Sequence, residues 1–358
     1  MTAAAIQLIH AGRQQSLTAK TPVHHQQLQT LSLEQIDKHL KKERHFDQKK
    51  TMKYFLSMFD KSDVMKNGGL SFTEVPPWSD IEMRYGSNPN ILGLDSCDKY
   101  RKSVHSSERY IAPSGLFHSG TNLVSEVLTA GCHIMSADDG RTTTPSSSIH
   151  FQVPWGKHNP QSARNEYRIP KDAYQDIDID NVLPIVMVRH PIDWMESMCR
   201  QPYAAKFIKN SNASTPDLPC PSMEVPVTVG FYRRFNYTNL LDLWKTWYQE
   251  HVIETDYPQL VVRLEDVVYR PRETLSQICD CGGGKFYWNA ASTLLTSKFG
   301  GRVSKDNDSS MNRNGILEAW TRHARVGVDR TVERPSDRQR VRDEGNAGLL
   351  KTLGYKLI

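Results

Sequence analysis

The segment that most constrains the fold comprises residues 111–128, IAPSGLFHSGTNLVSEVL. It begins with apolar residues, passes through a glycine-containing turn, and continues with apolar residues at helical spacing, which predicts a strand, a tight turn and a helix. The backbone amide groups of such a turn converge beside the positive end of the helix dipole. The segment therefore predicts a binding site for phosphate, although a Gly-Ser-Gly turn also occurs with no ligand.

The glycine spacing of this turn follows the nucleotide-binding pattern G-x-x-x-x-G-K-[ST] except at one position. Gly115 and Gly120 match the two glycines, whereas Thr121 stands where the pattern has lysine. In ATPases and GTPases that lysine contacts the β- and γ-phosphates. We therefore expect a phosphate cradle that is a poor ATPase or GTPase.

A second segment predicts another anion site at the same edge of the sheet. Residues 183–188, LPIVMV, form a continuous apolar run that is typical of a strand buried on both faces. Arg189 follows this strand, Pro191 suits the first turn of a helix, and Ser197 lies about two turns into that helix. Since ligands bind at the carboxyl ends of strands in open α/β sheets, Arg189 and Ser197 are expected to bind a second phosphate.

Together these segments resemble the P-loop sulfotransferases, which use 3′-phosphoadenosine 5′-phosphosulfate as the sulfuryl donor. The resemblance consists of SGT after a strand, and of a second strand ending in R-x-P-x-[DE] with a serine eight positions past the arginine. It covers about residues 110–358. It implies that Arg189 and Ser197 hold the 3′-phosphate. It also implies that the 5′ side is held by Ser119, Gly120, Thr121 and Asn122.

The family usually has lysine or arginine just before the SGT, and this chain has His118. Histidine helps the leaving group only when it is protonated, so its contribution depends on pH. The glycine-rich turn at residues 300–302 resembles the loop that closes on the 3′-phosphate in the family, which implies a further contact from Arg302.

The general base has two candidates. The peptide Lys157-His158-Asn159-Pro160 is similar to the K-T-H-x-P of the family's cytosolic branch, which carries the catalytic histidine. Sulfuryl transfer needs a group that takes the acceptor proton, and histidine titrates near neutral pH. In the Golgi branch a carboxylate after the first helix often has this role, and Asp138 or Asp139 stands in about that place.

The remaining pattern predicts an α/β fold with a central parallel sheet flanked by helices. Expected strands are residues 109–116, 148–153, 183–188 and 260–263, and expected helices are residues 122–130, 192–199, 237–255 and 341–353. Glu265 and Asp266 follow the last of these strands, and we expect them to be structural.

A helical extension precedes this domain. Residues 1–31 predict a flexible tail, residues 32–107 a helical and loop-rich extension, and residues 108–358 the sulfotransferase domain. Residues 63–74 approach an EF-hand calcium loop, but Met65 occupies a ligand position. A structural turn is the preferred interpretation, and calcium binding stays open.

Cysteines and sequons bear on the compartment. The chain has six cysteines, and a bridge between Cys199 and Cys220 is expected if the protein is lumenal. N-glycosylation patterns begin at Asn212, Asn236 and Asn307. The N-terminus is a poor signal peptide, so the chain belongs either in the cytoplasm or, if an upstream anchor is missing, in the Golgi lumen.

Charge and hydropathy exclude two classes of partner. The net charge of +5 over 358 residues is too diffuse to indicate nucleic-acid binding, and no apolar run is long enough for a membrane span. We expect a sulfotransferase without a metal, acting on a small-molecule or glycan hydroxyl (or amine). Carbohydrate is the preferred acceptor, because the loop-rich segment 201–229, with Tyr203 and its prolines, is expected to build an open polar cleft. The alternatives are a P-loop kinase and a non-catalytic nucleotide- or calcium-binding module.

Overall fold

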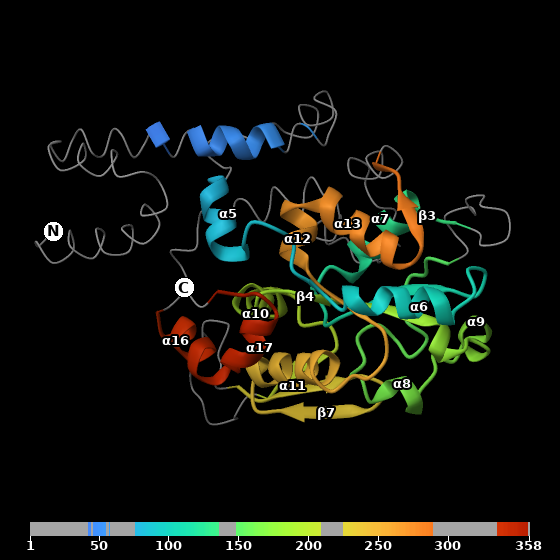
Figure 1. Cartoon of the computed structure of the whole chain (residues 1–358). Helices are drawn as coiled ribbons and strands as arrows, with labels where there is room; N and C mark the ends of the chain where they lie inside the picture. Colours follow the sequence, from blue (N-terminus) through green and yellow to red (C-terminus); the bar gives the residue numbers. More distant parts are fainter. Residues whose placement is uncertain are drawn as a thin grey trace, which may run out of the picture.

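The computed structural model describes residues 42–43, 46–54, 57, 76–135, 148–208, 225–288 and 335–356. Over these residues the chain is an α/β protein whose mixed, mostly parallel sheet is flanked by helices (Figure 1). Several predicted features lie outside the described residues: the tail 1–31, the turn 63–74, Asp138, Asp139, Asn212, Cys220, Arg302 and Asn307.

The main sheet has the strand order β1-β8-β4-β2. The central strand β4 (Val182–Val188) pairs in parallel with β2 (Tyr110–Ser114) on one side and with β8 (Leu260–Arg263) on the other. These three strands agree with the predicted parallel sheet. The edge strand β1 (Ile91–Leu92) is antiparallel to β8, and at two residues it is too short to give a sequence pattern.

The expected strand at residues 148–153 is reduced to one parallel bridge between Ile149 and Ile111. Beyond it the chain turns, because the Val153 carbonyl accepts a hydrogen bond from the Gly156 amide. Pro154 lies inside that turn and has no amide hydrogen to give to a strand. The segment still runs along β2, and it carries residues 157 and 158 to the carboxyl edge of the sheet.

Helices cover both faces of the sheet. In Figure 1, α7 (Thr121–Gly131), α12 (Leu264–Tyr269) and α13 (Pro271–Cys281) lie above β4, and α11 (Leu240–Val252) lies below it. α10 (Pro191–Arg200) follows β4. Further helices are α5 (Trp78–Tyr85), α6 (Cys97–Ser103), α8 (Ala163–Glu166), α9 (Asp172–Gln175), α16 (Pro335–Glu344), α17 (Ala347–Thr352) and the 3₁₀ turns Leu94–Ser96 and Ile179–Asn181, and residues 46–54 are also helical.

The predicted last helix is split into α16 and α17. Asn346 lies between them in the left-handed region, at φ 61°, and its side chain accepts a hydrogen bond of 3.1 Å from the Leu349 amide. This is an N-cap, which begins a new helix instead of continuing the old one.

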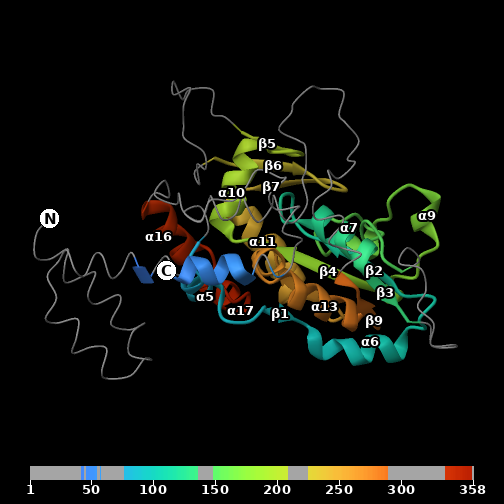
Figure 2. The ribbon, with the colours of Figure 1, turned by 90° about the horizontal axis from the view of Figure 1, so that it is seen from above.

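An antiparallel sheet of three strands occupies part of the region that was expected to be loop. It comprises β5 (Ala205–Phe207), β6 (Val227–Gly230) and β7 (Arg234–Tyr237), with β6 in the middle. Figure 2 shows it standing beside α10, away from the main sheet. The buried side chains of Val227 and Val229 are part of the hydrophobic core, and this packing holds the short strands in place.

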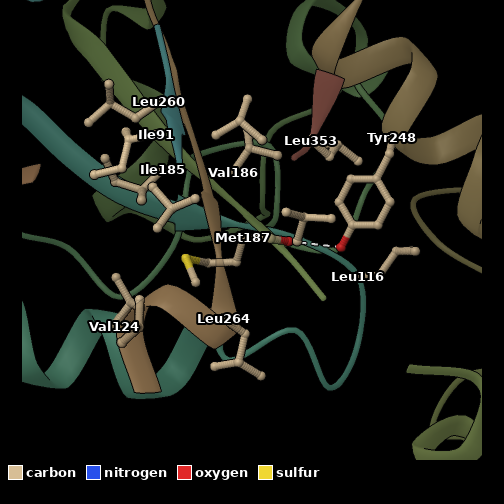
Figure 3. Close-up of a cluster of buried hydrophobic side chains, with 14 of the residues drawn as sticks. Ile91, Leu116, Val124, Ile185, Val186, Met187, Tyr248, Leu260, Leu264 and Leu353 are labelled. Carbon is tan, nitrogen blue, oxygen red and sulfur yellow. Dashed lines mark hydrogen bonds between the residues drawn. The ribbon is translucent and has the colours of Figure 1, made fainter. Parts of the chain in front are cut away.

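The core forms where the parallel strands meet the helices. Every residue of β4 is buried, as its unbroken apolar sequence predicts. Figure 3 shows Ile185, Met187 and Leu260 of the sheet packed among side chains from the flanking segments. Tyr248 of α11 donates a hydrogen bond of 2.8 Å to the Met187 carbonyl, which fixes the end of β4 just before Arg189.

Two disulfides join α13 to neighbouring elements. Cys97 is bonded to Cys281, and Cys132 to Cys279, over sequence separations of 184 and 147 residues. They tie α13 to the start of α6 and to β3 (Cys132–Ile134), a strand that follows α7 directly and pairs with β9 (Gly284–Phe286). Cys199 is also disulfide-bonded, and its partner lies outside the described residues.

In the described part of the chain, no helix combines the length and the apolar character needed to cross a bilayer.

Candidate functional site

The predicted phosphate loop, residues 115–120, joins β2 to α7. Gly120 ends it in the left-handed region at φ 91°, where a Cβ atom would also lie 2.5 Å from Leu264 Cδ1. The positive φ therefore favours glycine at this position, and a larger residue would also have to displace the Leu264 side chain. His118 adopts φ 61° as well, which is unusual for a side chain other than glycine.

Three successive carbonyl groups of the loop are bound by neighbouring side chains. Trp194 Nε1 donates to the Phe117 carbonyl at 2.7 Å. Arg189 Nη1 donates to the His118 carbonyl at 3.3 Å. Ser119 Oγ donates to the Leu116 carbonyl at 2.7 Å. With its carbonyls held in this way, and with no side-chain cap on α7 among the described residues, the loop leaves the first amides of α7 for a ligand.

The side chains of the loop and of the start of α7 differ in burial and in their hydrogen-bond partners. Ser119 is fully buried, and its hydroxyl is held by the Leu116 carbonyl, so any contact of this residue with a phosphate would come from its backbone. Thr121 is also buried. Asn122 is half-buried, and its Oδ1 accepts a hydrogen bond from Lys157 Nζ. His118 is half-buried, and its Nε2 lies 2.7 Å from the Gln201 carbonyl.

The residues of the predicted second anion site meet at the end of β4. Arg189 Nη1 donates a hydrogen bond of 2.8 Å to Ser197 Oγ, so the two residues meet across the first turns of α10. Arg200 Nη2 reaches the same oxygen at 3.2 Å. Ser197 Oγ in turn donates to the Asp193 carbonyl at 3.0 Å. Two guanidinium groups and one hydroxyl therefore gather on one face of α10.

Arg200 was not among the sequence-derived candidates. It lies three residues after Ser197, and helical periodicity places residues at that spacing on the same face. The helix predicted at residues 192–199 ends just before Arg200, which is why the prediction missed it.

Arg189 retains hydrogen-bonding capacity that the described residues do not use. Its Nε is buried and has no hydrogen-bond partner within the described part of the chain. A buried guanidinium nitrogen without an acceptor is costly, and an anion is the ligand that removes this cost. Because Arg189 also binds the His118 carbonyl, it links the phosphate loop to the site on α10.

A buried carboxylate supports the backbone after Arg189. Glu265 Oε1 accepts a hydrogen bond of 2.9 Å from the His190 amide, and Glu265 Oε2 accepts one of 2.9 Å from Tyr355. Burial and the nearby Asp193 raise the pKa of Glu265. Asp266 forms a buried ion pair with Arg263, at 2.6 Å, and is structural as predicted.

Lys157 and His158 adjoin the phosphate loop. The Gly115 amide donates to the Lys157 carbonyl at 2.7 Å, which fastens the start of the loop to the segment that carries both residues. Lys157 is buried, and its Nζ lies 3.6 Å from the centre of the Phe151 ring, beside Asn122. The Lys157 ammonium group therefore lies at the first turn of α7. The loop itself has Thr121 where the nucleotide-binding pattern has lysine.

The hydrogen bonds of His158 indicate its tautomer. Its Nδ1 lies 2.6 Å from the Gly115 carbonyl, and a carbonyl oxygen only accepts. Nδ1 must therefore carry the hydrogen, which makes Nε2 the basic nitrogen of the neutral ring. The His158 carbonyl is held by Trp247 Nε1 at 3.1 Å.

Aromatic rings line the region next to His158. The Phe117 ring lies 4.4 Å from the His158 ring and stacks on Tyr203 at 5.5 Å. Tyr203 is 42% exposed and also contacts His118, with ring centres 4.8 Å apart. The sequence drew attention to Tyr203 only as part of a polar loop, because nothing in the local pattern shows that it stacks on Phe117.

The structure thus brings His118, Lys157, His158, Arg189 and Ser197 to the same edge of the sheet as the phosphate loop. The rival bases Asp138 and Asp139, and the expected clasp Arg302, lie outside the described residues. Over the part of the chain that is described, no group of three or more His, Cys, Asp or Glu side chains is arranged to hold a metal ion.

Comparison with protein-family models, with curated proteins and with solved structures finds no match to this chain. The function is therefore inferred from the geometry of this site and from the resemblance of its two sequence motifs to those of the P-loop sulfotransferases.

Proposed function

We propose that this protein is a sulfotransferase that moves a sulfuryl group from 3′-phosphoadenosine 5′-phosphosulfate to an acceptor hydroxyl or amine. The observation that carries the proposal is the hydrogen-bonded pair of Arg189 and Ser197 beside the phosphate loop. Two separate anion sites at one sheet edge suit a nucleotide with phosphate groups at both its 5′ and 3′ positions. A nucleoside triphosphate has all its phosphates in one chain at the 5′ position, so it has no phosphate to place in the second site.

The 3′-phosphate is assigned to Arg189, Ser197 and Arg200. Arg189 Nε is a buried donor with no hydrogen-bond partner among the described residues, and Arg200 adds a second positive charge at Ser197 Oγ. Charge-assisted hydrogen bonds from a guanidinium fork to a phosphate are short and strong. The 5′ side is assigned to the amides at the start of α7 and to Lys157.

The chemical step needs a base and a site for developing negative charge. His158 Nε2 takes the acceptor proton while the acceptor atom bonds to sulfur and the sulfur–oxygen bond to the 5′-phosphate breaks. The adenosine 3′,5′-bisphosphate that leaves carries the released charge. Lys157 and the α7 amides stabilise that charge, and the buried position of Lys157 strengthens its effect.

A carbohydrate is the proposed acceptor class. The exposed ring of Tyr203, stacked on Phe117 next to His158, offers a flat surface that suits the face of a sugar ring. The disulfides support a lumenal compartment such as the Golgi, since disulfides persist where the environment is oxidising.

The test is transfer from a donor labelled in its sulfuryl group to a panel of glycans and small hydroxyl compounds, with and without chelator. We expect labelled product on at least one acceptor, in the presence of chelator, and much less of it with Arg189→Ala at the same subsaturating donor concentration. Transfer of a γ-phosphoryl group from ATP that requires magnesium would instead identify a P-loop kinase. Binding of nucleotide or calcium with no transfer to any acceptor would favour the non-catalytic module.

A further inference from the structure

The strand β7 carries an acceptor pattern for N-linked glycans, Asn236-Tyr237-Thr238. Along the strand, exposed residues alternate with half-buried ones, and Asn236 is exposed. β7 is the edge strand of its sheet in the described structure, and Figure 1 shows it at the lower rim of the molecule. The asparagine is therefore accessible in the folded chain.

A hydrogen bond fixes the orientation of the Asn236 amide. Asn236 pairs with Thr228 across the β6–β7 ladder, and Thr228 Oγ1 donates to Asn236 Oδ1 at 2.7 Å. Because the oxygen faces Thr228, the nitrogen Nδ2 is on the other side of the amide. Nδ2 is the atom that carries an N-linked glycan.

The disulfides supply an independent indication of the compartment. Cys97, Cys281, Cys132 and Cys279 are all buried in their bridges, and they are paired over long stretches of sequence. Disulfides of this kind are rare in the reducing cytosol and common in proteins that fold in the secretory pathway. N-linked glycans are added in that same pathway.

We propose that Asn236 is N-glycosylated. In this reaction Asn236 Nδ2 forms a bond to the anomeric carbon of an oligosaccharide, whose bond to a lipid diphosphate breaks. The amide nitrogen loses one proton, and the lipid diphosphate leaves. The glycan then covers the solvent face of β7, an edge strand that otherwise offers backbone groups to other chains. The modification does not depend on the activity proposed above.

The test uses the full chain, placed behind a cleavable signal peptide and produced in cultured animal cells, with secreted and cell-retained protein pooled. Trypsin cleavage after Arg234 and Lys245 releases the peptide FNYTNLLDLWK, which contains this pattern and neither of the other two. Treatment with peptide N-glycosidase in heavy-oxygen water converts a glycosylated Asn236 to labelled aspartate. We expect the label on most copies of this peptide.

Variants separate the glycan from changes in folding. Asn236→Gln and Thr238→Val both remove the pattern and are expected to abolish the label, whereas Thr238→Ser keeps the pattern and the hydroxyl that hydrogen-bonds Asp242 Oδ2. Recovery of the unmodified peptide from the wild-type chain would overturn the proposal.

Discussion

His158 Nδ1 lies 2.6 Å from the carbonyl oxygen of Gly115, so the imidazole is held against the first glycine of the phosphate loop. The same loop residue donates its amide to the Lys157 carbonyl. Both bonds tie the segment that carries the proposed base to the loop proposed to bind the donor. On this proposal, the backbone sets the distance between His158 and the bound donor.

Replacing His158 tests its role as general base. His158→Ala is expected to lower kcat by about 10²–10⁴-fold, the usual range for loss of such a group, with little change in donor affinity. The control is His105→Ala, which removes an exposed histidine. Near-wild-type turnover in His158→Ala would reject this base, and Asp138→Asn and Asp139→Asn would then be measured.

Lys157 is expected to act on the transferring group. Lys157→Met should lower kcat by about 10²–10³-fold, because one donor to developing negative charge is lost from a buried site. Lys171→Met, at an exposed lysine, is the matched control for loss of charge. Steady-state kinetics at saturating donor decides the question, and equal rates for the two variants would show that Lys157 has no special role.

The parts of the fold that were predictable are those whose signals are local. The β2–loop–α7 unit and the β4–α10 unit each combine a strand, a turn and a helix within a short segment. The Arg189–Ser197 contact follows from an eight-residue spacing between the end of one strand and the second turn of the helix after it, which the sequence displays directly. Buried parallel strands such as β4 also reveal themselves by an unbroken apolar sequence.

The features that escaped prediction depend on contacts between distant segments. Cys279 and Cys281 are bonded to Cys132 and Cys97, and no local pattern indicates such partners. The β5–β6–β7 sheet has strands of only three or four residues. The stacking of Tyr203 on Phe117 likewise requires the fold before it can be seen.

The disulfide between Cys132 and Cys279 should contribute substantially to stability, because it closes a long loop of the unfolded chain. The double variant Cys132→Ser/Cys279→Ser is expected to lose about 2–4 kcal/mol in the free energy of unfolding. Urea denaturation measures this loss. In a reducing agent the wild type should lose at least as much, and a variant as stable as the oxidised wild type would show that the bridge is absent or ineffective.

His251 should make stability depend on pH. Burial lowers its pKa to about 3 from an ordinary value of 6.5, and its ring stacks on Trp247 with centres 3.6 Å apart. Between these two pH values the unfolded chain binds a proton that the folded chain does not. Stability due to this group is therefore complete above about pH 6.5 and falls as the pH falls, by at most about 1.4 kcal/mol per unit.

The variant His251→Gln isolates this contribution. Its free energy of unfolding should be lower than that of the wild type at pH 7, but should decline less between pH 7 and pH 5. Carboxylates that titrate in this range are common to both proteins and cancel in the comparison. Parallel pH profiles for the two proteins would contradict a neutral, buried His251.

The central claim is that the Arg189–Ser197 pair binds a 3′-phosphate. Isothermal titration of wild type and Arg189→Ala with adenosine 3′,5′-bisphosphate and adenosine 5′-phosphosulfate measures this most directly, because the second ligand lacks the 3′-phosphate. The account predicts that Arg189→Ala loses about 2–3 kcal/mol of binding free energy for the bisphosphate and almost none for the phosphosulfate. Equal losses for both ligands, or no binding of the bisphosphate to the wild type, would contradict it.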